Sequence, residues 1–595
     1  MMKWLIGIAY LYVLIGIFFL LWSRPQIRGL IVRSWKKLLI FALINAAVMS
    51  LLLFLHLRQE SFIAYWDFSG FWRNTLLFKA MLDRSISEAM TNVYQSILNS
   101  EYNYVSEWFL YPLIRIIGDT YPRYVISVYL TYMIPANLLL YLSLLYLEEK
   151  GSFTQGTARF IALVIMTFGS NLYPLIQGYI GSAGLAIIIA LTLLMIDHAY
   201  DELNIGLSAA TGFYLLLLLV IRRWYAYWIV SFFIAWLLRY LLLDARKKGI
   251  PGLKGFLLNY AACGGTALGL LLLCFFQLFH TITTYDYSSA YSVMQLGGPL
   301  YITVHFIEWY GIIPVLLMIC GLCADWHDAE QRTIHLCLLV QILLCIILFN
   351  RVQVFGSHHY YIISIPCLFL IMDGILWLSR RFREKVVIPF CAVSVVICFN
   401  FTQTTVFSHL PLESVYQVTE SLTSRPLPYL RINQDKSQII SLANYLNAVS
   451  GDYQYIYVLA SSEKFNDDML RNAFLPDDLI GVRNLLKSSA YDERDGISSS
   501  FFQDYYVIVC DPVQIQFTED KQRCVTVLAD FMLHDSRVSS YYKVAKELTL
   551  ASGVKLKVFQ RIEQVPNSIR QEISDQLKSY YPDNPKMYTF DMLSE

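Results

Sequence analysis

Residues 205–243 read IGLSAATGFYLLLLLVI-RR-WYAYWIVSFFIAWLLRYLLL, two apolar stretches separated only by Arg222 and Arg223. Each stretch approaches the ~20 apolar residues that a helix needs to cross the hydrocarbon core of a bilayer. The pair therefore predicts a helical hairpin in a membrane and indicates that the chain is a membrane protein.

Ten other stretches of the same kind occur, and all of them end before residue 405. The twelve predicted spans are roughly 4–22, 38–57, 124–147, 159–177, 179–196, 205–221, 224–243, 256–279, 301–324, 333–350, 360–378 and 386–404. Only 15% of the 595 residues are charged, against about 25% in soluble domains, which excludes a water-soluble enzyme. The sequence predicts a polytopic α-helical membrane body over residues 1–404.

The orientation of this body follows from its basic loops. Residues 23–37 hold five Lys and Arg, and residues 244–254 and 379–385 hold four each. Lys and Arg concentrate in cytoplasmic loops, and with twelve spans these three loops share one side. We therefore expect the loops 58–123 and 280–300, and everything after residue 404, to be extracytoplasmic in a multi-pass protein of the cell membrane.

The part of the chain after the last span has a different composition. Residues 405–595 carry 25 acidic and 19 basic side chains, whereas residues 1–404 carry 20 acidic and 27 basic ones. We interpret 405–430 as a linker and 431–595 as a soluble α/β domain. The domain has no basic excess to present to nucleic acid and no glycine-rich phosphate-binding motif.

Within the soluble domain, four segments have clear secondary-structure patterns. Residues 436–447 favour a helix, 455–460 and 505–510 favour strands, and 543–550 with 554–561 favour a hairpin that turns at Ser552-Gly553. An apolar run, 525–533, lies between the second strand and the hairpin. Cys510 and Cys524 could form a disulfide outside the cell, although two cysteines alone do not establish one.

The first outer loop opens on Tyr65-Trp66-Asp67-Phe68-Ser69-Gly70-Phe71-Trp72-Arg73, an acid among aromatics suited to the membrane interface. Asp67 is a candidate binding or catalytic carboxylate, and the alternative is a solvated loop acid. Apolar residues at helical spacing then predict one or two amphipathic helices over 74–98 that lie on the membrane.

Basic side chains also occur on the predicted outer face, where they are unexpected. Arg222 and Arg223 occupy one outer turn, and Arg351, His358 and His359 occupy another. Snorkelling of span ends would explain each group separately, and the histidines could also cap a span. Together with Asp67 they suggest an anion-binding site.

The order of these elements resembles the membrane glycosyltransferases of the C superfold, in particular the bacterial branch similar to protein O-mannosyltransferases and aminoarabinose transferases. The similarity rests on an acid just after a span, two interfacial helices, and the run YVSEWFLYPLIRIIGD at 104–119 before the next span. The block HHYYIISIP at 358–366 is similar to the start of a late helix in that family. The resemblance covers roughly residues 38–404.

The resemblance implies an enzyme, a hexosyl- or pentosyltransferase. It would move a sugar from a polyprenyl-phosphate donor to a glycan, lipid-linked or protein acceptor by inverting displacement. Asp67 would act as the base, while Arg222, Arg223, Arg351, His358 and His359 would bind the donor phosphate. Trp66, Trp72, Trp224 and Tyr225 would contact sugar or acceptor, although the last two also suit an interfacial aromatic belt.

The chain departs from the family pattern where a second acid is expected. Phe68, and not an acid, follows Asp67, and the outer turn 170–180 contains no acid. Glu107 or Glu308 could supply the second carboxylate; Glu308 lies near the outer end of a predicted span, where an ionisable group is a candidate functional residue. The identity of a metal is open, with Mg²⁺ or Mn²⁺ as candidates.

Other classes of protein also have twelve spans and outer arginines. A polysaccharide polymerase, or a flippase or transporter of lipid-linked glycans, is the main alternative, and an assembly or sensor protein is another. A transporter should have ionisable residues deep in several spans or broken helices in corresponding halves. In this sequence the charges are concentrated at the outer ends of the spans, which favours the transferase.

Overall fold

The computed structural model describes residues 2–149, 155–295, 297–406, 410–423, 427–488 and 491–593, and they form two compact units. The first unit is helical and comprises Met1–Gln59, Asn74–Tyr285 and Gly297–Leu430. The second comprises Glu60–Arg73, Asp286–Leu296 and Arg431–Glu595. Two short segments of the predicted outer loops therefore belong to the same unit as the C-terminal domain.

The first unit contains seven helical stretches that are long and apolar enough to cross a membrane, within the part of the chain that the structure describes. They are α3 (Pro25–Leu57), Tyr121–Glu149, Gly156–Ile176, Tyr225–Asp244, Lys248–Cys274, α19 (Ala329–Asn350) and Ser357–Gln403. These helices make the chain a polytopic α-helical membrane protein. Their exposed apolar side chains are those expected where lipid replaces water as the surrounding medium.

Several of these stretches are built from more than one helix. Tyr121–Glu149 comprises α7 (Tyr121–Val128), the π-helical turn η1 (Tyr129–Met133) and α8 (Ile134–Glu149). Ser357–Gln403 contains α20 (Tyr361–Phe382) and most of α21 (Val387–Thr405). The two helices are separated by a 3₁₀ turn, η6 (Arg383–Val386), whose first residue has φ +50°. The remaining components are α9 (Gln155–Thr167), α10 (Gly169–Ile176), α13 (Tyr225–Arg239), η3 (Tyr240–Asp244) and α14 (Ala245–Cys274).

Shorter apolar helices account for three more of the predicted spans. They are α2 (Ala9–Trp22), which follows α1 (Met2–Gly7); Gly181–Ile196, made of η2 (Gly181–Gly184) and α11 (Leu185–Ile196); and α12 (Ile205–Ile221). Every predicted span thus falls on one or more helices, while the total of twelve crossings stays a prediction.

One predicted span, 301–324, is broken. It consists of α17 (Pro299–Tyr310) and α18 (Ile312–Cys323), which are bent by 102°. Gly311 between them has φ +80°, a conformation that glycine adopts without steric cost. Pro314 lacks the amide hydrogen that would donate back to Tyr310 in a continuous helix. The hydropathy of the segment cannot reveal this break because both halves are apolar.

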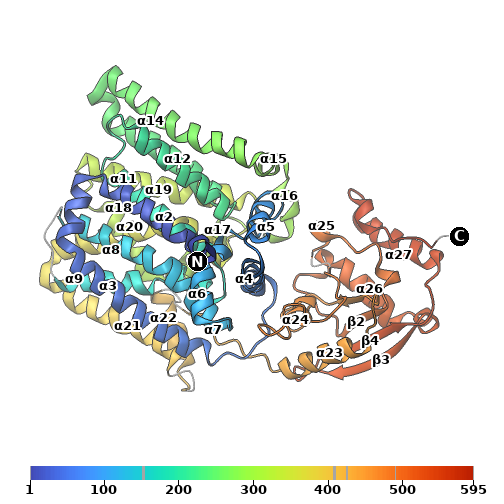
Figure 1. The fold of residues 1–595 in the computed structure, drawn as a ribbon. Coiled ribbons are helices and arrows are strands. Elements are labelled where there is room, and N and C mark those ends of the chain that lie inside the picture. The colour runs from blue at the N-terminus through green and yellow to red at the C-terminus, as the bar shows by residue number, and fades with distance from the viewer. Residues whose placement is uncertain are drawn as a thin grey trace. The chain divides into compact units, whose positions relative to one another are not determined.

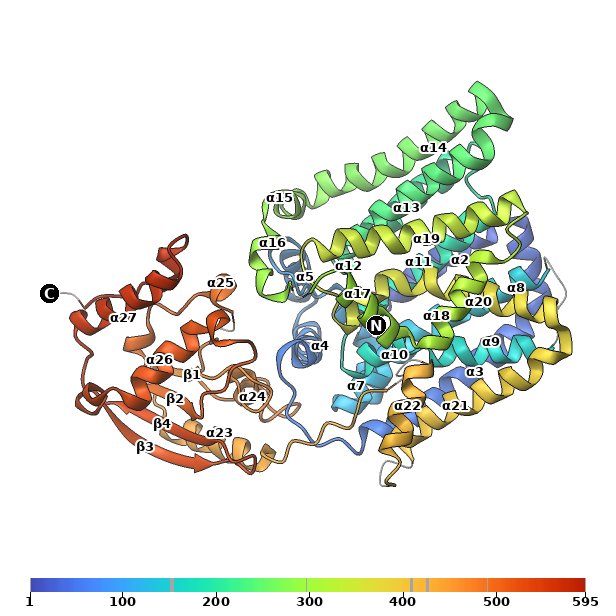
Figure 2. The same ribbon diagram turned by 180° about the vertical axis from the view of Figure 1, so that it is seen from behind.

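The helices pack closely where glycines meet backbone. A Cβ atom on Gly321 of α18 would lie 2.0 Å from the carbonyl oxygen of Leu370 in α20, and one on Gly374 of α20 would lie 2.1 Å from that of Leu317 in α18. Small residues allow such approaches between membrane helices. Elsewhere in the bundle α21 packs against both α3 and α9, and it can be followed beside them in Figures 1 and 2.

The segment 74–98, predicted to form one or two interfacial helices, is helical: it lies in α4 (Trp66–Arg84) and α5 (Ile86–Asn99), with Ser85 capping α5. The helix α4 begins before the predicted start, so Asp67 lies in its first turn and not in a loop. A third helix, α6 (Val105–Ile117), precedes α7. In α5 the buried residues Ala89, Val93 and Ile97 recur every four positions, which defines one apolar face. Two short helices follow α14, namely α15 (Phe276–Thr284) and α16 (Tyr287–Ala290).

The second unit contains a four-stranded sheet in the order β1-β2-β4-β3. The strands β1 (Ile456–Leu459) and β2 (Tyr506–Asp511) are parallel, while β3 (Tyr542–Thr549) and β4 (Lys555–Arg561) form an antiparallel hairpin. Strand β2 pairs with β4 in the register Ile508↔Val558. The helix, the two strands and the hairpin that the sequence predicts are all confirmed.

The two faces of the sheet are covered by different helices. Ile456, Val458 and Ile508 pack on the side of α23 (Lys436–Val449) and α24 (Asp467–Arg471). Tyr457, Leu459, Val507 and Val509 pack on the other side, against α26 (Arg523–His534) and α27 (Asn567–Tyr580) (Figure 1). This alternation is the two-residue period of a strand that is buried on both faces.

Three details differ from the simplest interpretation of the sequence. The apolar run 525–533 is part of the helix α26. Cys510 and Cys524 are both buried and free, so no disulfide joins them in this structure. The predicted linker 405–430 contains a helix, α22 (Glu413–Thr423), that packs against α18 and α21, while 407–409 and 424–426 lie outside the described residues.

Candidate functional site

Arg222 occupies a buried position at the carboxyl end of α12. The helix ends because Arg222 has extended backbone (φ −152°, ψ 126°). The residue is only 8% exposed. Its guanidinium lies 4.9 Å from the ring centroid of Tyr102, within cation–π range. A buried guanidinium at the end of an apolar helix is costly unless other groups compensate its charge.

Glu107, in the first turn of α6, is fully buried. Neither of its carboxyl oxygens has a hydrogen-bond partner among the described residues. Burial raises the pKa of Glu107 to about 8, while the positive charge of Arg222 acts in the opposite direction. The carboxyl group is therefore protonated at neutral pH and can donate a hydrogen bond.

His358 and His359 lie in the 3₁₀ turn η5 (Ser357–Tyr360) that begins the helix α20. The backbone N–H of Gly356 donates to Nδ1 of His359 at 2.9 Å, which leaves Nε2 of a neutral imidazole as the donor. His358 stacks on Tyr179, with centroids 4.0 Å apart and an interplanar angle of 11°. Arg222 is close enough to interact electrostatically with both imidazoles.

Trp224 and Tyr225 follow the arginines at the start of α13. The hydroxyl of Tyr225 donates to the carbonyl oxygen of Gly181 at 2.6 Å, so this buried ring ties α13 to η2. The Trp224 ring lies 4.3 Å from that of Tyr225 and perpendicular to His359 at 6.1 Å. Trp224 therefore forms an aromatic wall beside the histidines, whereas Tyr225 has a structural contact.

The structure thus brings together four ionisable side chains from three segments that lie far apart in the sequence: Glu107, Arg222, and the neighbours His358 and His359. We call them the buried polar cluster. They come from α6, the end of α12 and η5. The guanidinium of Arg222 supplies positive charge, and the protonated carboxyl group of Glu107 and the imidazole N–H groups can donate hydrogen bonds. This combination suits an anion such as a phosphate ester.

Other predicted site residues of the first unit have different surroundings. Arg223 donates from Nη2 to the carbonyl oxygen of Ser100 at 2.9 Å, a contact that holds the segment after α5. Arg351 is exposed at the C-terminal cap of α19. The Glu308 side chain is 60% exposed and pairs with Nδ1 of His305 at 2.8 Å.

Asp67, Trp66 and Trp72 belong to the second unit, as part of Glu60–Arg73. Asp67 is half-buried in the first turn of α4, and its negative charge acts on the hydroxyl of Tyr491. Burial is the main reason that the pKa of Tyr491 rises to about 12. Trp72 is buried, and Trp66 has φ +49°.

The sequence leaves a metal open, with Mg²⁺ or Mn²⁺ as candidates. Among the residues that the structure describes, no group of three or more His, Cys, Asp or Glu side chains could hold a metal ion. The described residues therefore do not form a Mg²⁺ or Mn²⁺ site of that size, and we derive no step through a metal.

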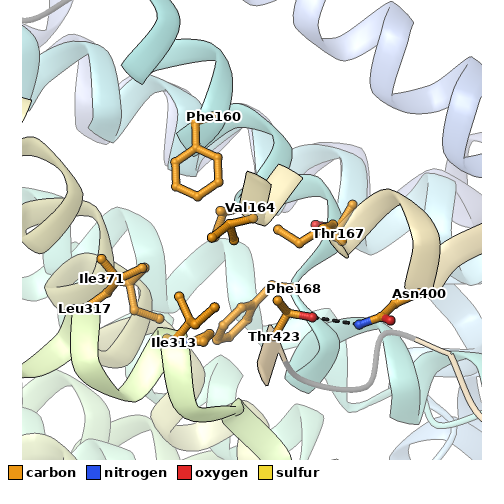
Figure 3. A pocket seen from close by; sticks show the side chains of 12 residues that line it. Phe160, Val164, Thr167, Phe168, Ile313, Leu317, Ile371, Asn400 and Thr423 are labelled. Atoms are coloured by element: carbon orange, nitrogen blue, oxygen red, sulfur yellow. Dashed lines mark hydrogen bonds between the residues drawn. The ribbon is translucent and has the colours of Figure 1, made fainter. Parts of the chain in front are cut away.

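The first unit also contains an apolar pocket, shown in Figure 3. Phe160, Val164 and Phe168 form one wall of it, and Ile313, Leu317 and Ile371 another. Asn400 and Thr423 line a polar side of the pocket, where Nδ2 of Asn400 donates a hydrogen bond of 2.7 Å to Oγ1 of Thr423. None of the described residues that line the pocket is ionisable, so it offers no group for acid–base chemistry.

Two residues that contact the buried polar cluster could not be identified from sequence patterns alone. Tyr102 forms the cation–π contact with Arg222, and Tyr179 stacks on His358. Both are aromatic residues in loops, a type that is common at membrane interfaces. Nothing in the spacing of either residue distinguishes it from the other tyrosines of the chain.

The fold defines a polytopic α-helical membrane protein with an α/β domain, and its first unit carries a buried polar cluster. No family model and no curated protein matches the sequence. The structure is similar to that of ArnT from Cupriavidus metallidurans, solved bound to undecaprenyl phosphate. The TM-score is 0.45 and the identity 11%, over 87% of this chain and 97% of ArnT.

Proposed function

We propose that this chain is an integral-membrane glycosyltransferase that moves a sugar from a polyprenyl-phosphate donor to an acceptor on the outer face of the membrane. The observation that carries the proposal is the buried polar cluster. Arg222 is 8% exposed and interacts with Glu107, His358 and His359 at the ends of apolar helices. A fixed cation in a site that excludes water stabilises a departing phosphate strongly.

The proposed reaction is a displacement at C1 of the donor sugar. The acceptor oxygen forms a bond to C1 as the bond from C1 to the phosphate oxygen breaks, and the configuration at C1 inverts. The acceptor proton passes to a base, for which the family resemblance indicates Asp67. The phosphate leaves with the electron pair, and Arg222, with hydrogen bonds from Glu107 and the histidines, stabilises its charge.

Three further considerations support a lipid-linked donor. The helix α5 has an apolar face of the kind that lies in a membrane interface. The pocket in Figure 3 has apolar walls that suit isoprenoid units. Nucleotide sugars are absent outside a cell, so a lipid-phosphate donor also follows from the predicted orientation. The acceptor class, whether glycan, lipid-linked molecule or protein, is open in this proposal.

The test uses the purified full chain and a labelled polyprenyl-phosphate sugar, with loss of label from the lipid as the measurement. We expect Arg222→Ala to lower kcat about 10²-fold or more, the usual effect of removing one stabilising donor. Arg222→Lys should restore part of the activity because it keeps the charge but loses the two-pronged geometry.

The matched control is Arg381→Ala, which removes an exposed arginine at the predicted cytoplasmic end of α20 and should leave transfer unchanged. Equal activities of the Arg222→Ala, Arg381→Ala and unmodified proteins would contradict the phosphate role of Arg222. Absence of any transfer by the unmodified protein, with several sugars and acceptors, would contradict the proposed function itself.

A second candidate function is transport or polymerisation of lipid-linked glycans, and the 102° break between α17 and α18 favours it. Broken helices form substrate sites in many transporters. In reconstituted vesicles, a transporter would move a labelled lipid-linked sugar between leaflets without cleaving it. A polymerase would lengthen a lipid-linked glycan. The transferase instead releases polyprenyl phosphate.

A further inference from the structure

The segment that carries Asp67 is built into the C-terminal domain. Ser61 pairs with residues that begin this domain: its N–H donates to Arg431 O at 3.0 Å, and its carbonyl accepts from Asn433 N–H at 2.7 Å. Beside this pair, the Arg431 guanidinium donates twice to the Glu60 carboxylate, at 2.8 and 2.6 Å. The chain thus enters the second unit through a strand-like contact and a bidentate ion pair.

The next residues of the segment join the core and a helix of the domain. Ile63 is 3% exposed and belongs to the hydrophobic core formed with α23 and β1. The carbonyl oxygen of Ala64 accepts a hydrogen bond of 3.0 Å from Nδ2 of Asn472, just beyond α24. The backbone is therefore already fixed three residues before Asp67.

Asp468 of α24 holds the residue directly before Asp67. Its Oδ2 accepts from the backbone N–H of Trp66 at 2.9 Å. Trp66 has φ +49°, a conformation that a bulky residue keeps only where its surroundings hold it. Asp467, the neighbouring acid, is engaged elsewhere, because its Oδ2 accepts from Ser488 N–H and from Arg471 Nη2, each at 3.2 Å.

The chain is held again on the far side of Asp67. Arg73 donates from Nη2 to the carbonyl oxygen of Leu479 at 2.9 Å, and Leu479 lies in the loop that follows α24. The same helix and the residues after it therefore fix the backbone both before and after Asp67. The hydroxyl of Tyr491, another residue of this unit, interacts electrostatically with the Asp67 carboxylate.

We propose that Asp468 is a positioning residue for Asp67: by accepting the Trp66 N–H it holds the left-handed start of α4 and so directs the Asp67 carboxylate. The inference rests on the proposed function, in which Asp67 is the base. It assigns a role to the C-terminal domain, which becomes a required part of the catalytic machinery. A base displaced by about 1 Å can lose about 10²-fold in rate.

The experiment separates the position of the hydrogen-bond acceptor from its charge. In the full chain, Asp468→Asn keeps an oxygen at the same place but removes the charge, whereas Asp468→Glu keeps the charge and moves the oxygen. We expect Asp468→Glu and Asp468→Ala to lower kcat about tenfold or more, with donor KM within twofold. Asp468→Asn should retain at least a third of the unmodified kcat.

Hydrogen exchange of the peptide covering residues 60–73 provides a readout that does not depend on activity. Exchange at the Trp66 amide should accelerate in Asp468→Ala and Asp468→Glu but not in Asp468→Asn. Asp477→Ala is the matched control, since Asp477 is an exposed acid a few residues after α24. It should change neither exchange nor transfer.

Asp67→Asn distinguishes failure of the inference from failure of the proposed function. If Asp67→Asn retains transfer, Asp67 is not the base, and the assignment of the base in the proposed function is wrong. If Asp67→Asn is inactive but Asp468→Glu has full kcat, the positioning role is wrong. An inactive Asp468→Asn beside an active Asp468→Glu would also overturn it, because charge and not position would then matter.

Discussion

At the scale of single residues, Glu107 is the clearest conflict between a side chain and its surroundings. The carboxyl group is fully buried, and its oxygens have no hydrogen-bond partner among the described residues. Burial raises its pKa from about 4.5 to about 8. A carboxyl group kept neutral at pH 7 can donate a hydrogen bond to an anion beside Arg222, which an ionised one would repel.

Glu107→Gln should remove a pH dependence of stability. Between pH 4.5 and 8 the unfolded chain releases the Glu107 proton while the folded protein keeps it, so the stability of the unmodified protein falls as the pH rises through this window. Below pH 4.5 both states are protonated and the effect vanishes. Each pKa unit corresponds to about 1.4 kcal/mol. Glutamine cannot ionise, so the variant should be the more stable protein at pH 8.

The measurement is the midpoint of thermal unfolding in detergent at pH 5 and at pH 8. Glu384→Gln, a change at an exposed acid after α20, should follow the unmodified protein at both pH values. If the Glu107→Gln profile runs parallel to that of the unmodified protein, Glu107 ionises normally and cannot be the neutral donor described above.

At the scale of elements, glycines set how closely the membrane helices approach. Gly321 and Gly374 place the backbones of α18 and α20 against each other, and a Cβ on either would lie within 2.1 Å of a carbonyl oxygen. In α14, by contrast, no atom lies within 4 Å of a Cβ built on Gly269. The same residue type therefore has a packing role in one helix and none in another.

Gly321→Ala should destabilise the protein by about 1–3 kcal/mol, because the methyl group forces α18 and α20 apart. Gly269→Ala should be neutral or stabilising by up to about 1 kcal/mol, since alanine favours a helix more than glycine does. Unfolding midpoints of the two variants provide the comparison. A Gly321→Ala midpoint equal to that of Gly269→Ala would show that the crossing tolerates a side chain.

At the scale of the whole molecule, the set of chain segments that forms the second unit constrains the membrane topology. Segments 60–73, 286–296 and 431–595 form one compact unit, and it has its own hydrophobic core on each face of its sheet. A folded domain of this kind cannot be divided by a bilayer, so the chain must cross the membrane an even number of times between these segments. The predicted spans satisfy this condition, with six between the first two segments and four between the last two.

Protease sites inserted at Gly451-Asp452 and at Ser288-Ser289 should therefore be cleaved from the same side of the membrane. We expect both to be cut in intact cells by an added protease, whereas a site inserted within 379–385 should be cut only in inverted vesicles. Cleavage of the first two sites from opposite sides would contradict the assignment of residues 286–296 to the second unit.

The sequence by itself determined the features that depend on local patterns. Apolar runs of sufficient length indicated the membrane helices, and alternating residues between turn signals indicated the strands and the hairpin at Ser552-Gly553. Arg222 and the two histidines were identified as candidates because basic residues are unexpected on the predicted outer face, and Glu107 was identified because the family resemblance calls for a second acid. These features need no knowledge of distant residues, since water, lipid and backbone geometry act on each segment separately.

Only the tertiary structure decided which of these residues meet. Glu107 and Arg222 are brought together by the packing of α6 and α12, and no local pattern encodes that pairing or the loss of water that neutralises Glu107. The break at Gly311 and the union of residues 60–73 with the C-terminal domain were likewise invisible to hydropathy. Local sequence determines which faces are apolar or polar, whereas the pairing of distant faces depends on how all of them pack at once.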